Sequence, residues 1–339
     1  MSDAAPLARL VASPRRMSAA ELVPIVIFAG FALVPFAAAF GARAYILDLF
    51  TRVMIFSIAA IGLDLIVGYG ALVSFGHAAF VGLGAYAVAI LASHGVNDAL
   101  VSLPVALAAA TLFALATGAV SLRTQGVYFI MITLAFGQMA YFTASSLAPY
   151  GGDDGLTIHM RNAIAGVEIF KDQRAFYYIV LACLLGCYLL CRAIVVSRFG
   201  RVLRGARENP TRLAAIGFDV YRFQLVAYAI SGALGGLAGF LLANHTEFVS
   251  PAYMSWPRSG ELIIMILLGG IGRLHGAIIG AIVLLLVEEW LSGVTEYWKM
   301  IFGPFLVLVV LFARGGLIGA WNQIAARLRQ KPHDAARHG

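Results

Sequence analysis

The chain has 339 residues, of which 61% are hydrophobic and only 12% are charged. Soluble globular domains carry about 25% charged residues, so this composition excludes an ordinary soluble enzyme or binding domain and indicates an integral membrane protein. The formal net charge of +7 has no soluble domain on which to form a basic face for nucleic acid. We therefore expect no nucleic-acid partner and interpret the excess of Lys and Arg as an orientation signal.

Apolar runs long enough to cross a bilayer recur along the chain, since a spanning helix needs about 20 mainly apolar residues. They lie near residues 22–40, 46–68, 74–93, 100–121, 126–147, 176–196, 223–244 and 300–313. Before the last of them, two shorter apolar pieces, 261–271 and 275–291, are separated by GGIGRLHG. This pair predicts either a re-entrant excursion followed by a helix, or two crossings of which one is broken. The fold class is thus an all-α, polytopic transmembrane helical bundle of eight to ten membrane segments with broken or re-entrant helices.

Lys and Arg near the segment ends predict the orientation of the bundle. They favour a cytoplasmic tail at 1–20, a transmembrane domain at 21–313 and a second cytoplasmic tail at 314–339. Residues 148–175 then form an external loop, and 197–222 form the longest internal one. The first apolar run ends in FAAAFGARA, which resembles a secretory cleavage site, but its length favours a retained helix.

The three cysteines, Cys183, Cys187 and Cys191, fall four apart inside one apolar segment. This placement excludes an extracellular disulfide framework. A metal or redox site and small residues at helix-packing spacing are the two alternatives, and we favour packing. We expect neither a metal site nor catalytic residues.

The stretch GYGALVSFGHAAFVGLGAY carries a histidine among closely spaced glycines. Glycine removes the side chain that restricts the backbone and lets neighbouring helices approach, so Gly76, Gly82 and Gly84 predict a kink or an unwound turn. Ser74 is placed to cap a half-helix that begins there. Half-helix ends at membrane depth expose backbone groups that can hold a polar or zwitterionic solute. The predicted pathway residues are Asp64, Ser74, Phe75, Gly76, His77 and Gly82.

Two of these side chains are ionisable, and each has two interpretations. His77 is either a hydrogen-bond partner of a neighbouring helix or a pathway or gating residue. Asp64 is either a structural hydrogen-bond partner or a residue that faces the pathway. Proton- or sodium-coupled carriers need more acidic groups at the midplane, so ion coupling is poorly supported.

An internal similarity links the two halves of the chain. GYGALVSFGHAAFVGLGA and LGGIGRLHGAIIGA both contain closely spaced glycines followed by a histidine. Paired glycine-interrupted segments of this kind favour pseudo-symmetric repeat halves with the pathway between them.

The internal loop SRFGRVLRGARENPTRLAAIGFDVYRFQ predicts a short helix outside the membrane. Asn209 can cap it, Pro210 suits its first position, and Gly217 can end it in a left-handed conformation. Leu213 and Ile216 then lie three apart on one face. The helix either rests on anionic lipid through Arg201, Arg204 and Arg207 or docks into a groove of a cytoplasmic partner.

The chain has no GxxxxGK[ST] phosphate loop, and none of its three lysines follows a glycine. It therefore has no nucleotide cradle of that kind, and energy for active transport would have to come from another chain.

Five motifs in order carry a resemblance to a known family: GLDLIVGYGALVSFGHAAFVGLGAYA, YFIMITLAFGQM, GGDDGLT, RFGRVLRGARENPTRLAAIG and FVSPAYMSWPRSGELIIMILLGGIGRLHGAIIGA. Over residues 45–313 the chain resembles the permease subunits of the branched-chain (hydrophobic) amino-acid ABC importers, of the LivM-like kind. Its internal loop departs from the general EAA-type pattern of such permeases. Ala214, Ala215 and Gly217 match, but Leu213 precedes the alanines and the glycine comes early.

The resemblance implies a bacterial inner-membrane importer for a branched-chain or hydrophobic amino acid or a related small amphiphilic solute. Its partners would be a second permease (a LivH-like homologue or another copy), two cytoplasmic ATPase subunits that carry ATP and Mg, and a periplasmic solute-binding protein. This chain would hold no cofactor. Residues implied in ATPase coupling are Arg204, Glu208, Asn209, Pro210, Leu213, Ala214, Ala215, Ile216 and Gly217.

Two other classes of protein share some of these features. An autonomous secondary carrier or channel would transport alone, but the internal helix and the few midplane acids argue against it. An intramembrane enzyme would need a nucleophile with a base or a metal cluster, and His77 and His275 lack a pattern such as HExxH.

Overall fold

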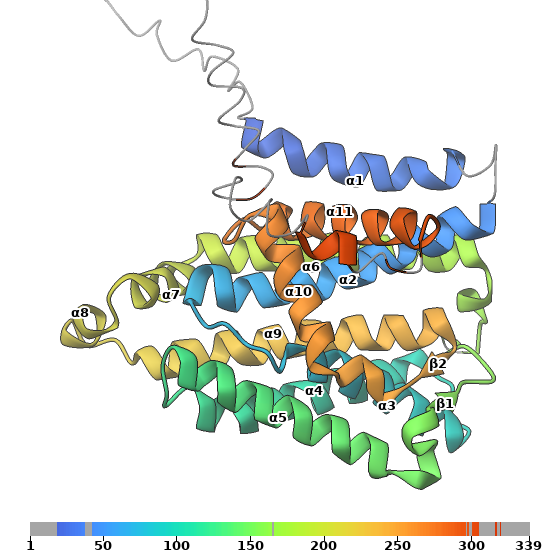
Figure 1. The fold of residues 1–339 in the computed structure, drawn as a ribbon, viewed down its shortest axis with the longest axis horizontal. Coiled ribbons are helices and arrows are strands. Elements are labelled where there is room, and N and C mark those ends of the chain that lie inside the picture. Colours follow the sequence, from blue (N-terminus) through green and yellow to red (C-terminus); the bar gives the residue numbers. More distant parts are fainter. Residues whose placement is uncertain are drawn as a thin grey trace, which may run out of the picture.

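The computed structural model describes residues 19–37, 43–164, 166–295, 297, 300–304, 316 and 319. Within them the chain forms a bundle of long helices (Figure 1). The bundle helices are α1 (Ala19–Ala37), α2 (Arg43–Gly70), α3 (His77–Ser93), α4 (Ala99–Ser121), α5 (Val127–Ser146), α6 (Gln173–Val196), α9 (Val220–Thr246), α10 (Trp256–Gly269) and α11 (Leu274–Ser292). Six of these, α2, α4, α5, α6, α9 and α11, are long and apolar enough to cross a membrane. The prediction of an all-α polytopic bundle is confirmed.

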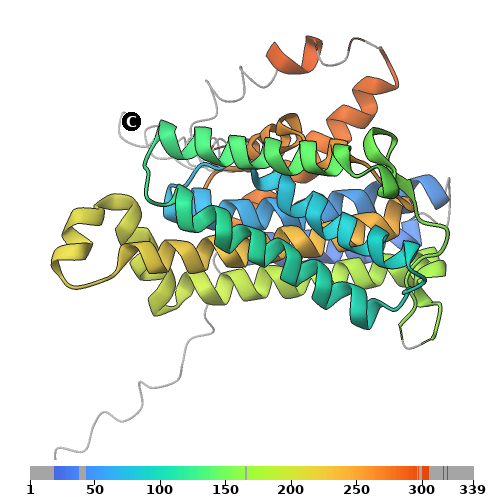
Figure 2. The same cartoon turned by 90° about the horizontal axis from the view of Figure 1, so that it is seen from below.

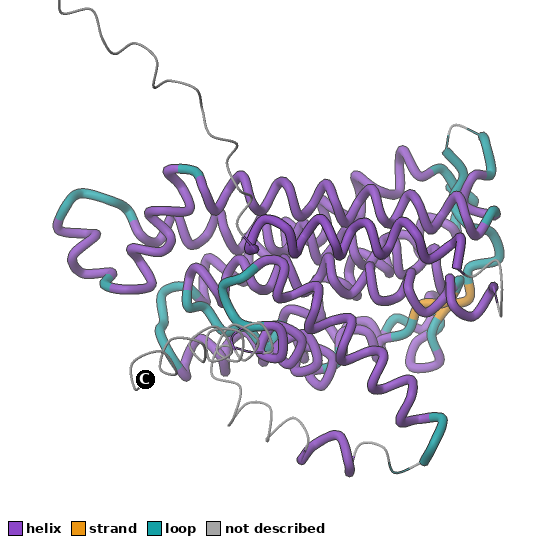
Figure 3. The backbone as a smooth tube through the Cα atoms, turned by 90° about the horizontal axis from the view of Figure 1, so that it is seen from above, coloured by secondary structure: helices purple, strands orange, loops and turns teal. Residues whose placement is uncertain are grey.

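The two ends of the bundle carry different short elements. At one end the helices α7 (Arg198–Glu208) and α8 (Pro210–Ala215) project beyond the others (Figure 2). At the other end β1 (Leu156–Thr157) and β2 (Phe248–Val249) pair antiparallel, close to the connections between helices (Figure 3). The loops predicted at 197–222 and 148–175 thus lie at opposite ends. Most of the predicted tails 1–20 and 314–339, and of the run 300–313, lies outside the described residues.

The pair of apolar pieces at 261–271 and 275–291 forms two helices joined by a turn. α10 has only 14 residues, which at about 1.5 Å per residue is too short to cross a bilayer. It follows a non-helical stretch that contains the 3-10 turn η5 (Pro251–Met254). The chain therefore crosses from β2 at one end to the turn after α10 at the other as a broken element, the second of the two predicted alternatives.

Helix α9 is the centre of the packing, and its glycines allow the contact with α4. A Cβ on Gly232 would lie 2.5 Å from the Cβ of Ala114, and one on Gly236 would lie 2.7 Å from the Cβ of Ala110. Such distances are too short for any side chain, so the two backbones approach as closely as glycine and alanine permit. Close approach of this kind is how helices associate in lipid, where there is little hydrophobic drive between them.

A second pair of glycines on α9 allows the contact with α3. A Cβ on Gly235 would lie 2.7 Å from the Cβ of Phe80, and one on Gly239 would lie 1.9 Å from the carbonyl oxygen of Val81. The sequence SGALGGLAGF therefore carries two GxxxG pairs, offset by three residues. Because the offset places the pairs on different faces, one helix holds two neighbours at backbone contact.

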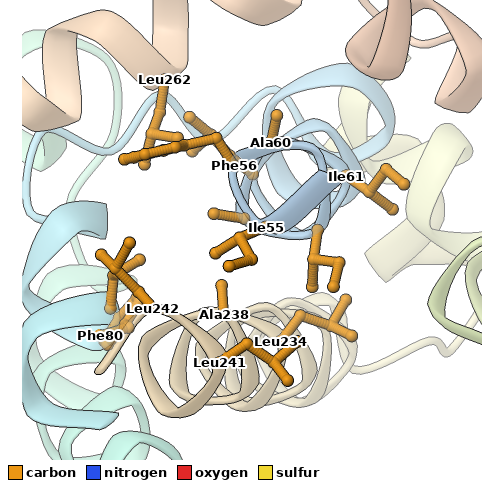
Figure 4. Packing of buried hydrophobic residues seen from close by; sticks show 14 of the residues in the cluster. Ile55, Phe56, Ala60, Ile61, Phe80, Leu234, Ala238, Leu241, Leu242 and Leu262 are labelled. Atoms are coloured by element: carbon orange, nitrogen blue, oxygen red, sulfur yellow. The ribbon is translucent and has the colours of Figure 1, made fainter. Parts of the chain in front are cut away.

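The third face of α9 packs against α2. The Ser231 hydroxyl donates a hydrogen bond to the Gly62 carbonyl, and Ile55 points toward Ala238 (Figure 4). These pairs show that α2 and α9 run antiparallel. In the spanning part of α2, 94% of the residues are buried, against 28% in α4 and in α5, so α2 is enclosed by the chain while α4 and α5 present open faces.

We expect Gly239→Ala to destabilise the bundle by about 1–3 kcal/mol, the usual cost of overpacking, because the new methyl group would collide with the Val81 carbonyl. The measurement is the thermal unfolding midpoint and the monodisperse yield in detergent. Gly186→Ala in α6 is the matched control, since its Cβ would meet nothing within 4 Å. Equal behaviour of the two variants would contradict the role assigned to α9.

Candidate functional site

The first break in the bundle lies between α2 and α3. The Leu72 amide donates to the Ile66 carbonyl at 3.0 Å, and Ala71 takes a left-handed φ of 56°. Because the Ala71 amide itself donates to the Val67 carbonyl at 3.2 Å, this is an αL helix ending, which normally uses glycine at the left-handed position. Residues 71–76 are then non-helical until α3 begins at His77. The predicted break is confirmed.

The prediction that Ser74 caps α3 is wrong. The residue before α3 is Gly76, and no side chain caps the helix there. Ser74 lies two residues too early, and its buried hydroxyl has no regular hydrogen-bond partner among the described residues. A serine two residues before the capping position cannot reach the first free amides of the helix.

The non-helical segment packs against α5 at Phe75 and Gly76. The Phe75 amide donates to Thr133 Oγ1 at 3.3 Å. A Cβ on Gly76 would lie 2.2 Å from the Thr133 carbonyl oxygen, and one on Gly137 would lie 3.0 Å from the Gly76 Cα. Only glycine fits at residue 76, and irregular backbone at membrane depth is stable when protein surrounds it in this way.

A second break lies in the other half of the chain, between α9 and α10. Glu247 ends α9 with a left-handed φ of 54°, and residues 247–255 lead through η5 to α10. The Ala78 amide in the first turn of α3 donates to Ser259 Oγ, in the first turn of α10, at 3.0 Å. The two helix starts, each carrying a partial positive charge, therefore meet inside the bundle.

The two breaks form an inverted pair. In each case a long helix ends, a short non-helical segment turns back into the bundle, and a shorter helix begins. Because α2 and α9 run antiparallel, the two units point in opposite directions, as in inverted repeats that place a pathway at their junction.

The similarity between the two glycine-rich stretches did not locate this second break correctly. It paired the α2–α3 connection with the turn between α10 and α11, which is also a connection between helices but lies at the α7 end of the bundle. The break that meets α3 is instead marked by SPAYMSWPRSG, in which two prolines and three serines are a recognisable signal for interrupted helix.

His77 is the first residue of α3 and is fully buried. Its ring packs edge-on against Phe80, with centroids 5.1 Å apart. Neither ring nitrogen has a regular hydrogen bond, although the Ala59 backbone interacts with the ring. This contact joins α3 to α2, as expected for a hydrogen-bond partner of a neighbouring helix, and the pathway interpretation of His77 stays a prediction.

The sequence allowed a kink or an unwound turn at Gly82 and Gly84, but α3 continues through both residues. A Cβ on Gly82 would lie 2.1 Å from Met254 Cγ, and one on Gly84 would lie 2.2 Å from the Gly236 carbonyl oxygen. Gly82 thus seats Met254 of η5 against α3, next to the junction of the two breaks. Met254 and Ser259 are site residues that the sequence pattern had not identified.

Asp64 lies five residues beyond Ala59 along α2, toward the end that carries α7. Its side chain is fully buried, and Oδ1 accepts a hydrogen bond from the Gly272 amide at 2.8 Å. The Arg207 guanidinium donates to the Gly68 carbonyl and interacts with the Asp64 charge. These contacts favour the structural interpretation: Asp64 joins α2 to the turn between α10 and α11, beside α7.

The short internal helix forms as predicted. Asn209 Oδ1 accepts from the Arg212 amide at 2.9 Å, Pro210 occupies the first position, and Gly217 has a left-handed φ of 95°. The preceding arginine-rich stretch is itself a helix, α7, capped by Ser197. The loop is thus a helical hairpin and not a single helix.

Most of the predicted docking residues of the hairpin are exposed, but Leu213 packs against α7. Leu213 is half-buried and packs on Gly205 of α7, whereas Ile216 is 68% exposed. Glu208, Asn209, Pro210, Ala214, Ala215 and Gly217 are also exposed. The outward apolar surface is therefore formed by Ala214, Ala215 and Ile216, while Leu213 fixes α8 to α7.

Two arginines tie α7 to the bundle. Arg204 donates to the carbonyls of Gly200 and Val195, which links α7 to the end of α6. Arg207 reaches the end of α2 as described above. These contacts place the guanidinium groups against backbone carbonyls. The contact of these arginines with anionic lipid stays a prediction. The role of Arg207 between α7 and Asp64 was not apparent from the sequence.

The three cysteines lie in α6 without a disulfide, Cys187 and Cys191 being buried and Cys183 partly so. Within the described ranges, no three His, Cys, Asp or Glu side chains gather in a group that could hold a metal ion. The packing interpretation of this stripe agrees with its burial.

We expect His77→Phe to keep the folded yield and to lower solute uptake about tenfold, the effect of losing one hydrogen bond that the ring gains in another conformation. Phenylalanine preserves the packing on Phe80, whereas His77→Ala also leaves a cavity and should lower both quantities. Uptake into cells and detergent yield are measured for each variant. Normal uptake by His77→Phe would show that His77 contributes to packing and has no role in the pathway.

The sequence matches the family model for the branched-chain amino acid transport system permease component over residues 45–311. It is 28% identical over 297 residues to the high-affinity branched-chain amino acid transport system permease protein LivM of Escherichia coli K12, covering 80% of this chain and 69% of that protein. LivM of Salmonella typhimurium is 26% identical over 295 residues with the same coverage. The LivH permease of E. coli K12 is 30% identical over 125 residues, or 36% of this chain and 40% of LivH.

No solved structure matches this chain. The family match covers both breaks, the hairpin α7–α8 and the Asp64 junction. The chain belongs to the permease components of branched-chain amino acid transport systems and is LivM-like.

Proposed function

We propose that this chain is the membrane-spanning permease subunit of an ABC importer that carries branched-chain or hydrophobic amino acids, or a related small amphiphilic solute, across a bacterial inner membrane. Family membership supports the class. The observation that carries the proposal is the helical hairpin α7–α8, which projects from one end of the bundle (Figure 2). Its residues Ala214, Ala215 and Ile216 are exposed. An exposed apolar helix face of this kind suits docking into a partner's groove.

The partner at the hairpin is a cytoplasmic ATPase subunit, two copies of which supply ATP binding and hydrolysis with Mg. The permease itself is a transport subunit without its own nucleotide site, in line with the absence of a phosphate loop from its sequence. The hairpin end is then cytoplasmic, as are both termini. The opposite end, with β1 and β2, faces the periplasm and a solute-binding protein.

A second permease, LivH-like or another copy of this chain, completes the pathway. The open faces of α4 and α5, only 28% buried in their spanning parts, are available for that chain and for lipid. Their exposed side chains are large and apolar, including Leu112, Val120, Met131, Met139 and Phe142.

Coupling runs from the hairpin into the bundle through two rigid connections. ATP draws the two ATPase subunits together, and their motion displaces α7. Arg204 carries this displacement to the end of α6, and Arg207 carries it to the end of α2. Since Asp64 binds the α10–α11 turn beside Arg207, both inverted units respond together. The motion favours one conformation of the pathway over the other.

We expect Ile216→Asp to leave the permease folded and to weaken its retention of the ATPase about tenfold or more, because a carboxylate would replace an apolar group in the docked groove. The tagged permease is expressed with its neighbouring genes and purified in mild detergent, and the ATPase that co-purifies is quantified by mass spectrometry. Met160→Asp, at a residue 50% exposed at the other end, is the matched control.

Leu213→Asp should weaken the ATPase association as well, and it should also loosen α8 because Leu213 packs on α7. Unchanged recovery of the ATPase with Ile216→Asp would show that this face of the hairpin does not dock to the ATPase. Recovery of the wild-type chain alone, with its neighbours well expressed, would favour an autonomous carrier or channel over the importer.

A further inference from the structure

A charged cavity opens at the end of the bundle opposite to α7–α8. It measures about 400 Å³ and lies between α2, the end of α9 and the η5–α10 break. Its lining includes Asp48, Arg52, Phe56, Leu242, Tyr253 and Arg258. This volume is within the range of small-molecule sites, about 300–1,000 Å³.

One face of α2 supplies an anion, a cation and an aromatic ring in succession. Asp48, Arg52 and Phe56 are spaced four residues apart, so they lie above one another along the helix. Asp48 is the outermost, with its side chain 61% exposed, and Phe56 is buried. The cavity therefore changes from charged to apolar along its depth.

The cation in this row is held in place without an anionic partner. The Arg52 guanidinium lies 5.9 Å from the centroid of the Phe56 ring, and no described carboxylate lies within 4.0 Å of it. Arg258 lies over the same ring at 5.9 Å but is paired with Glu261 at 2.6 Å. Arg52 thus offers its forked N–H donors, which match a carboxylate in bidentate geometry.

The other charged groups leave this arrangement intact. Asp48 Oδ1 lies 3.3 Å from His245 Nε2 at the wall of the cavity. Glu288 of α11 interacts electrostatically with Arg52 and Arg258, but at a distance longer than an ion pair. The carboxylate of a bound solute could therefore form a direct ion pair with Arg52.

A narrow space continues from the charged cavity toward the breaks. It shares Phe56, Leu242, Tyr253 and Arg258 with the cavity and adds the apolar residues Ala78, Val81 and Leu262, and its volume of about 10 Å³ is that of a single water molecule. Ala78 is in the first turn of α3, where α3 meets α10. The charged opening therefore leads to the junction of the two broken helices.

We propose that this cavity is the outer solute site of the permease and that it binds a zwitterionic α-amino acid with an aliphatic side chain. Arg52 binds the α-carboxylate, Asp48 faces the ammonium group, and the side chain lies against Phe56 and Leu242 at the inner end of the cavity. The polar head and the apolar tail of such a solute follow the same order as the lining residues. The proposal rests on the importer function proposed above and assigns its entry site.

The test uses the assembled importer in lipid nanodiscs without the binding protein, and measures binding of radiolabelled L-leucine with L-leucinamide as competitor. Leucinamide has no carboxylate, so we expect it to compete about tenfold or more less well than leucine. Arg52→Gln should weaken leucine binding about tenfold or more and abolish this discrimination. Arg52→Lys, which keeps the charge but loses the fork, should fall between the two.

Arg174→Gln is the matched control, because Arg174 is an exposed arginine at the same end of the bundle, in the first turn of α6. It should bind leucine as the wild type does. Size-exclusion profiles and retained ATPase identify any variant that fails to fold or assemble. If Arg52→Gln fails in this way, the test rests on the binding measured for Arg52→Lys.

Uptake by the wild-type importer separates the two proposals. If wild-type cells or proteoliposomes take up leucine while Arg52→Gln binds it as well as the wild type, or while leucinamide competes equally, the site is refuted and the importer function stands. If the wild type takes up neither an amino acid nor a related small amphiphilic solute when all partners are present, the proposed function itself is refuted. Loss of binding confined to the Arg52 variants supports the site.

Discussion

Backbone contact along α9 is the constraint on which the rest of the bundle depends. Four glycines in SGALGGLAGF bring α3 and α4 against two faces of this helix, while a third face carries the Ser231 hydrogen bond to α2. In a bilayer the hydrophobic effect does little to hold apolar helices together, so such contacts have to supply the packing energy. With α2, α3 and α4 fixed on α9, the remaining helices surround a rigid centre.

That rigid centre makes the two breaks possible. Non-helical backbone at membrane depth has to be buried in protein or line a water-filled cavity. Here α5 packs against Phe75 and Gly76 through Thr133 and Gly137, while α3 contacts η5 at Gly82. The starts of α3 and α10 then meet, and the Ala78 amide of α3 donates a hydrogen bond to Ser259 Oγ of α10.

The two ends of the bundle are specialised by charge. At one end Arg204 and Arg207 bind backbone carbonyls and fasten the α7–α8 hairpin to α6 and α2. At the other end Arg52 and Arg258 lie over the ring of Phe56 beside an open cavity. Arginine suits both positions, because its planar group binds carbonyl and carboxylate oxygens with several donors and also stacks on aromatic rings. α2 spans the distance between the two ends and contributes residues to both.

The sequence by itself determined the helices, the break before His77 and the capped helix at Asn209, because apolar run length, glycine clusters and Asn-Pro caps act locally. It also determined the family, through five ordered motifs. Only the tertiary structure decided which breaks face each other, that Asp64 accepts a hydrogen bond from Gly272, and that Leu213 packs on α7 while Ile216 is exposed. These outcomes depend on contacts between residues up to 208 positions apart, and such contacts follow from how the helices pack around α9, which no local pattern encodes.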